Sequence, residues 1–156
     1  MNRFLDVIRS VAMTVALFKG DTTAVHMLQP QAFQCVATTA FGEARGEGID
    51  GMALVVRSMV NRNRITDRKS CQIARKSYGG YQAMRHRLPQ RVDNLAWERA
   101  QLVSVAVIAG GIDLGACNDV THFLNPRDVK KRPLWATRDN QICRIGHHIA
   151  YRVAAL

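Results

Sequence analysis

Cysteine is scarce in this chain of 156 residues, and the spacing of its four cysteines excludes several protein classes. Cys35, Cys71, Cys117 and Cys143 lie far apart and form no C-x-x-C pair, which argues against a zinc ribbon or a thioredoxin-type motif. The spacing fits free thiols of a cytosolic protein as well as two disulfides formed in an oxidising compartment. Glycine and cysteine contents are also too low for a collagen-like chain or a disulfide scaffold.

Acidic residues are few, and glutamate is the rarer of the two. Only Glu43, Glu47 and Glu98 are present, so chemistry that needs a glutamic acid has few candidates. Against 12 acidic residues stand 22 Lys and Arg, a net charge of +10 that indicates a nucleic acid, a membrane or a bacterial envelope as partner. An apolar content of 47% at this length excludes a disordered chain and predicts one domain with a core.

No apolar run in residues 1–19 is long enough to span a bilayer, because Asp6 and Arg9 interrupt it. No small-x-small cleavage site follows, as a secretory signal would require. The apolar residues of this stretch recur at helical spacing: Phe4, Ile8, Val11, Val15 and Phe18. We expect residues 1–30 to contain an amphipathic helix that Gly20 ends and that packs on the domain through this face, with a signal-anchor role as the alternative.

Two helices are predicted on either side of a glycine-rich turn. Residues 31–44 carry apolar side chains at helical spacing, and the run Arg45-Gly46-Glu47-Gly48 breaks that pattern. Asp50 is positioned to cap the following helix. The expected buried stripe of that helix is Met52, Val55, Val56, Met59 and Val60.

The rest of the chain predicts shorter elements. Ser70 is expected to cap a short helix that runs to Lys76, and Gly79-Gly80 predicts a turn. Asp93 is expected to cap a helix that runs to about Ala109. The expected buried face of that helix is Leu95, Leu102, Val103, Ala106 and Val107. Residues 120–124 and 142–151 predict short strands, with a turn at Asp139-Asn140, so the fold class is α+β, mainly α, with a small β element.

Three sequence blocks occur in a recognisable order between residues 40 and 152. The first is Gly42-Glu43-Ala44-Arg45-Gly46-Glu47-Gly48, followed by a helix that ends in Val60-Asn61-Arg62. The second is His122-Phe123-Leu124-Asn125-Pro126, and the third is Ile145-Gly146-His147-His148-Ile149-Ala150-Tyr151. Together they resemble the SleB-like cell-wall hydrolases, the spore-cortex-lytic and related peptidoglycan-cleaving enzymes that include phage endolysins. The chain departs from that pattern at Tyr81-Gln82-Ala83, where the family reads Q-F-S, and at His147, where it has asparagine.

The resemblance implies a lysozyme-like single domain over residues 31–156 that cleaves the MurNAc–GlcNAc bond of peptidoglycan, as a lytic transglycosylase or a muramidase. It implies Glu43 as the catalytic acid and no metal or organic cofactor. The residues it implies as substrate contacts are Glu47, Tyr81, Gln82, Asn125 and His148. A short, basic, free-standing enzyme of this kind is most similar to a monomeric phage endolysin, made in the host cytoplasm and acting on the periplasmic cell wall.

The chemistry of Glu43 fits this role independently. Cleavage of a glycosidic bond needs a carboxylic acid that is still protonated near neutral pH. Apolar neighbours and a helix C-terminus both raise the pKa of a carboxyl group. Glu47 is expected either to order the turn or to act as a second carboxylate in the cleft, and Glu98 to lie on the surface.

A nucleic-acid-binding protein without catalytic activity is the alternative, because the net charge also fits a phosphate backbone. The apolar stripe of residues 52–60 leaves few side chains to read base edges, so we expect no nucleic acid partner. His147 and His148 resemble a metal pair, but neighbouring residues of a strand face opposite sides. We expect His148 to be a buried, hydrogen-bonded residue and no metal site to form.

Overall fold

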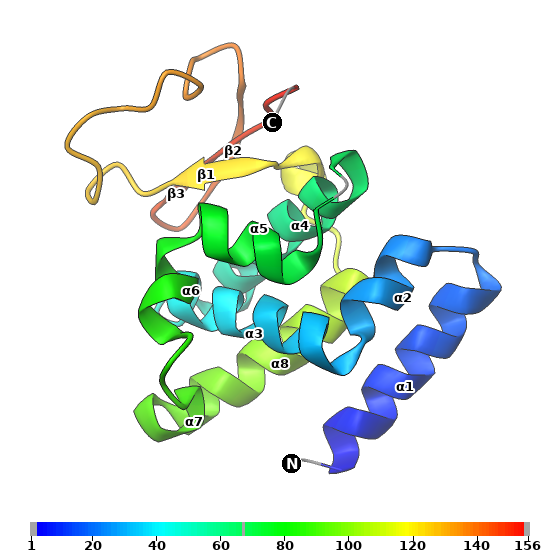
Figure 1. The fold of residues 1–156 in the computed structure, drawn as a ribbon. Coiled ribbons are helices and arrows are strands. Elements are labelled where there is room, and N and C mark those ends of the chain that lie inside the picture. Colours follow the sequence, from blue (N-terminus) through cyan, green and yellow to red (C-terminus); the bar gives the residue numbers. More distant parts are fainter. Residues whose placement is uncertain (1–2, 67, 155–156) are drawn as a thin grey trace.

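The described part of the chain, residues 3–66 and 68–154 of a computed structural model, is helical up to residue 108 and carries its strands after residue 120 (Figure 1). This is the mainly helical α+β fold that the sequence predicts. The helices are α1 (Arg3–Phe18), α2 (Thr22–Leu28), α3 (Pro30–Ala44), α4 (Gly48–Ile65), α5 (Ser70–Ser77), α6 (Gly79–Met84), α7 (Pro89–Val92) and α8 (Asn94–Ile108). A 3-10 helix (Gly115–Asp119) then leads to β1 (His122–Leu124), β2 (Gln141–Ile145) and β3 (His148–Tyr151). The sequence did not predict α2, α6, α7 or the 3-10 helix.

Helix α3 forms the centre of the helical layer. Pro30 begins it at a position where a missing backbone N–H costs nothing, and side chains from Ala32 to Ala44 are buried around most of its circumference. It packs against α4, α5, α6 and α8, which surround it in Figure 1. A helix enclosed in this way has a fixed C-terminal end, and that end carries Glu43.

The turn between α3 and α4 differs from the prediction in one detail. Helix α4 begins at Gly48, whose φ of +74° favours glycine, and Glu47 occupies the N-cap position. Asp50 was expected to be the cap and instead lies exposed in the first turn, where its charge favours the helix N-terminus. The predicted buried stripe of α4 is confirmed.

The cap of α8 is also confirmed, because the Asp93 side chain accepts a hydrogen bond from the N–H of Ala96. The buried face was predicted wrongly in part: Leu95 is 72% exposed and Leu102 is 44% exposed. Trp97 and Ala100 take their place in the core, next to the predicted Val103 and Val107.

Two smaller predictions were wrong by one residue or one element. Ser70 is the first residue of α5 and not its cap, which is Lys69. Gly79-Gly80 begins α6 and does not form a free turn. Tyr78 separates the two short helices.

Helix α1 forms as predicted, but it packs through the other side. Its buried residues are Leu5, Ala12 and Ala16. The predicted face is exposed at Val11, Val15 and Phe18. Of the predicted face, Ile8 packs against the core, together with Leu5 and Met13.

The sheet is a three-stranded antiparallel sheet in the order β1-β3-β2. Residues 142–151 were predicted as strand, and the structure resolves them into a hairpin of β2 and β3 with a turn at Gly146-His147. All four residues of β3 are buried, because β3 is the central strand. The turn at Asp139-Asn140 is confirmed.

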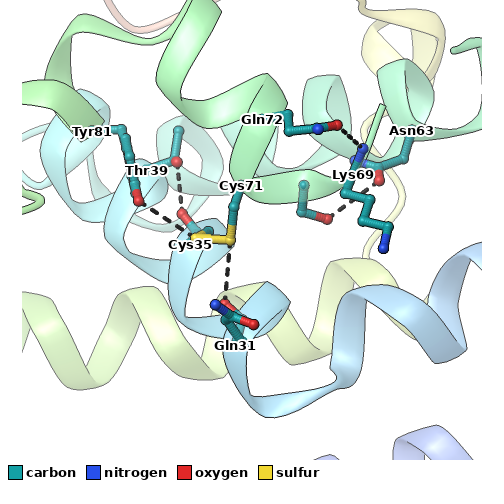
Figure 2. Close-up of a disulfide and its surroundings, with 9 residues drawn as sticks. Gln31, Cys35, Thr39, Asn63, Lys69, Cys71, Gln72 and Tyr81 are labelled. Carbon is teal, nitrogen blue, oxygen red and sulfur yellow. Dashed lines mark hydrogen bonds between the residues drawn. A yellow bond between two sulfur atoms is a disulfide. The ribbon is translucent and has the colours of Figure 1, made fainter. Parts of the chain in front are cut away.

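All four cysteines are paired. Cys35 of α3 is bonded to Cys71 of α5, and Cys117 of the 3-10 helix is bonded to Cys143 of β2. Figure 2 shows the first disulfide between the two helices, with Gln31 and Tyr81 beside it. The two bonds tie α5 to the central helix and the sheet to the segment that follows α8.

Candidate active site

Glu43 lies in the last turn of α3, next to the start of α6. Its Oε1 accepts a hydrogen bond of 2.7 Å from the backbone N–H of Gly80. The two helices come this close because Gly42 and Gly80 face each other: a Cβ on either residue would overlap the backbone of the other. The glycine pair therefore sets the distance between the Glu43 carboxyl and its donor.

The surroundings of Glu43 favour the protonated carboxyl. Burial raises its pKa most, the hydrogen bond from Gly80 lowers it, and the negative charge of Asp128 raises it, so that the pKa lies above the ordinary value. The guanidinium of Arg45 lies over the ring of Phe41, 5.4 Å from its centroid. A raised pKa shifts a carboxyl towards the protonated form that general acid catalysis requires.

A pocket of about 130 Å³ opens beside Glu43. Its lining comes from the ends of α3 and α4, the α5–α6 junction, β1 and the loop before β2: Glu43, Arg62, Ser77, Tyr78, Gly79, Thr121, His122, Phe123 and Trp135. One acid, one guanidinium, hydroxyls and aromatic rings thus face the same space, a mixture that can orient a polar ligand and contact its apolar faces. A larger pocket of about 410 Å³ lies between α1, α3, α7 and α8, and no residue of the three sequence blocks lines it.

Arg62 is a fixed positive charge in the pocket wall. One of its terminal nitrogens donates to Ser77 Oγ at 2.9 Å, and its guanidinium lies 5.5 Å from the centroid of the Tyr78 ring. The Tyr78 hydroxyl lies 2.7 Å from Ser58 Oγ. Burial raises the pKa of Tyr78, so its phenol stays neutral and serves as structural support for Arg62.

His122 and Trp135 form the aromatic side of the pocket. Their ring centroids are 4.7 Å apart, and Trp135 makes an edge contact with Tyr151 at 5.4 Å. Nδ1 of His122 lies 3.0 Å from Thr121 Oγ1. Burial and the charge of Arg62 lower the pKa of His122 to about 4, so its imidazole is neutral at physiological pH. A carboxyl with a raised pKa and a neutral imidazole therefore line one pocket.

Glu47 binds the turn of the β2–β3 hairpin. Its Oε2 accepts a hydrogen bond of 3.0 Å from the backbone N–H of His147, and its Oε1 lies 2.9 Å from His147 Nδ1. The Nδ1 of buried His148 is 3.9 Å from Glu47 Oε2. Burial raises the pKa of Glu47, but the hydrogen bonds and charges of the two histidines outweigh this and lower it. Glu47 is therefore an ionised residue that holds the sheet against the helices.

Asn61 connects α4 to the approach of β1. Its side-chain amide donates to the carbonyl oxygens of Asn118 at 2.8 Å and Val120 at 2.7 Å. Asn61 thus fixes the segment that leads to His122, while the next residue, Arg62, lines the pocket. The Asn-Arg pair at the end of α4 serves two different functions in the site.

None of the five predicted substrate contacts lines the pocket. Tyr81 is buried with its hydroxyl 3.5 Å from Cys35 Sγ, as Figure 2 shows, and Gln82 is exposed with its amide bonded to the carbonyl of Arg75. Asn125 shapes the turn after β1 by accepting hydrogen bonds from the N–H groups of Arg127 and Asp128. Their binding of substrate, like that of Glu47 and His148, stays a prediction.

The expectation that His148 is buried is confirmed, but its Nδ1 has no hydrogen-bond partner among the residues that the structure describes. Its ring packs edge-on against Phe123 at 4.9 Å. Within residues 3–66 and 68–154 no group of three or more His, Cys, Asp or Glu side chains is arranged to hold a metal ion.

Sequence reasoning missed four residues around Glu43. Arg62 and His122 lie inside the recognised blocks, so their position was a usable signal. The Trp135 side chain fits a core residue or a groove aromatic from sequence, and its ring contributes to the pocket wall. Asp128 is exposed in the loop after β1, and only its charge effect on Glu43 identifies it.

No protein-family model, curated protein or solved structure matches this chain.

Proposed function

We propose that this protein cleaves the glycan strands of bacterial peptidoglycan, with Glu43 as the general acid. The observation that carries the proposal is the meeting of the three sequence blocks at one place. The first supplies Glu43, and the helix that follows it carries Arg62 in its last turn. The second supplies His122, and the third contacts Glu47 through His147. Blocks up to 100 residues apart in sequence thus contribute to one pocket and its immediate support.

The first step of the proposed reaction is proton donation by Glu43, which its raised pKa favours. The protonated carboxyl donates its proton to the oxygen of the MurNAc–GlcNAc bond as the bond between that oxygen and C1 of MurNAc breaks. The GlcNAc residue leaves with a hydroxyl group, and positive charge develops at C1. The Glu43 carboxylate then takes the proton of the muramyl 6-hydroxyl while the oxygen of that hydroxyl bonds to C1. The products are a 1,6-anhydro ring and a restored acid.

We favour this transglycosylase route because the nearest glutamate is occupied. A hydrolase of the usual kind needs a second carboxylate as nucleophile or as base for water. Both oxygens of Glu47 already interact with His147. Asp50 is exposed in the first turn of α4, outside the pocket lining. Glu43 alone can supply and recover the proton.

Mass spectrometry of fragments released from purified sacculi tests this proposal. We expect anhydro-muramyl ends from the wild type and a loss of about 10²–10⁴ in rate for Glu43→Gln, because that change removes the transferable proton and keeps the shape. Glu98→Gln, on the exposed side of α8, is the matched control and should remain active. Reducing muramic acid ends would contradict the transglycosylase route. DNA retention without any wall cleavage would contradict the proposal and favour the nucleic-acid alternative.

A further inference from the structure

The outer side of α1 carries an apolar stripe of four residues: Val7, Val11, Val15 and Phe18. They are spaced by four, four and three residues, which places them along one face of the helix. Their exposed fractions are 61%, 58%, 41% and 89%. A different face, with Leu5, Ala12 and Ala16, packs on the protein. Exposed apolar side chains in a row along a helix form an outer surface suited to another apolar phase.

The charges of α1 are arranged around this stripe. Asp6, its one acidic residue, accepts a 3.3 Å hydrogen bond from Arg9, and Arg9 also donates to the Leu28 carbonyl on α2 at 2.8 Å. That pair therefore belongs to the packed side. Arg3 and Lys19 are exposed at the two ends of the helix. Exposed cations lie at both ends of the stripe, and the one acidic residue of the helix, Asp6 beside Val7, is paired with Arg9.

We propose that the α1 stripe docks on an anionic lipid membrane, with the helix axis parallel to the membrane surface. Apolar side chains on one face with cations beside them are the features by which an amphipathic helix enters the boundary between headgroups and acyl chains. No helix among the described residues is long and apolar enough to cross a bilayer, so the fit is to the surface of the membrane. The proposal does not depend on the cleavage reaction.

A second copy of this chain is the less favoured occupant. Each copy carries a net charge of +10, so two copies repel each other, whereas an anionic bilayer attracts the same charge and also accepts the apolar stripe. Figure 1 shows α1 at one end of the helical layer, away from the sheet. The Glu43 pocket is built from other elements, so a docked α1 leaves its lining residues free.

Vesicle co-sedimentation at 0.1 M salt tests the docking. The wild type should bind vesicles of phosphatidylglycerol and phosphatidylcholine and bind pure phosphatidylcholine vesicles weakly. Val11→Gln/Val15→Gln should reduce binding to the anionic vesicles at least about tenfold, because the free energy of transferring two valine side chains from water into the membrane is lost. Glutamine has the higher helix propensity, so α1 should stay folded, and circular dichroism checks this. Leu95→Gln/Leu102→Gln is the matched control on the exposed side of α8 and should bind like the wild type.

A second readout reports on the helix itself. Phe18→Trp, at an 89% exposed position, should show a blue-shifted emission and quenching by brominated lipid only with anionic vesicles. Equal binding by wild type and Val11→Gln/Val15→Gln would overturn the proposal, and so would the absence of vesicle binding. A wild-type dimer that Val11→Gln/Val15→Gln converts to a monomer, without vesicle binding, would assign the stripe to self-association and also overturn it.

Discussion

Glu47 holds His147 with both of its carboxylate oxygens, although the two residues are 100 positions apart in the sequence. The contact joins the α3–α4 turn to the β2–β3 turn. It requires Gly146, because a Cβ at this position would overlap Glu47 Oε2 and its φ is +55°. Glu47, four residues after Glu43, therefore helps to position the sheet that carries His122 relative to Glu43.

Glu47→Gln should lower the free energy of unfolding and leave the proposed catalytic acid, Glu43, in place. Glutamine cannot accept with both terminal atoms, and the loss of charge weakens the contact to half-exposed His147, at a cost of about 1–2 kcal/mol. Chemical denaturation at pH 7 measures this difference. Because the folded-state pKa of Glu47 lies below its ordinary value of 4.5, the stabilisation exists above that value and is lost as the pH falls through the folded-state pKa. Wild type and variant should therefore converge in acid, and wall cleavage by folded Glu47→Gln should persist.

Asp128→Asn should shift the alkaline limit of activity to lower pH. The charge of Asp128 raises the pKa of Glu43, so its removal lets Glu43 lose its proton earlier. The pH profile of wall cleavage measures the shift, and Asp139→Asn, in the same loop, is the control. If Asp128→Asn is as inactive as Glu43→Gln at every pH, and wild-type products carry reducing ends, Asp128 is a second catalytic carboxylate.

Acid should destabilise the protein through His122. Its pKa is about 4 in the folded state against an ordinary value of 6.5, so the unfolded chain binds a proton over this range and the folded state does not. Stability should fall as the pH decreases from 6.5 to about 4, and His122→Gln should flatten that slope. Denaturant unfolding across this range, with exposed His86→Gln as control, provides the measurement. A His122 ring resonance that titrates near 6.5 by NMR would contradict the prediction.

Reduction of the disulfides should lower the free energy of unfolding substantially. The bonds close loops with sequence separations of 36 and 26 residues, for which loss of the cross-link costs about 3–4 kcal/mol each. Cys35→Ala/Cys71→Ala isolates the first bond and Cys117→Ala/Cys143→Ala the second, each compared by thermal unfolding with the oxidised wild type. Thiol titration of the native protein that detects free cysteine would show the pairing to be wrong.

Local patterns predicted the elements better than their faces. Asp93 and the apolar run after it were sufficient to predict α8, because capping and periodicity act within one helix. The outward direction of Leu95 and of Val11 depends on which neighbour the helix meets, and periodicity within the helix does not contain that information. On α1 the small residues Ala12 and Ala16 form a second, narrower stripe, and close packing selected it.

The site was predictable where its chemistry is local. The position of Glu43 at a helix end with apolar neighbours could be predicted because these features are adjacent in sequence, whereas its catalytic role came from the resemblance and stays a prediction. The cysteine pairing and the contact between Glu47 and His147 could not, because they depend on long-range packing. Tyr81 illustrates the limit: it follows a glycine pair as a groove residue would, but its ring fills the space beside Cys35.

The contact between Gly42 and Gly80 makes the proton affinity of Glu43 a function of the spacing between two helices. The amide of Gly80 strengthens the acid only while the backbones of α3 and α6 touch. A single methyl group between them would withdraw this amide and leave Glu43 holding its proton more tightly. Two residues without side chains thus set the proton affinity of a third.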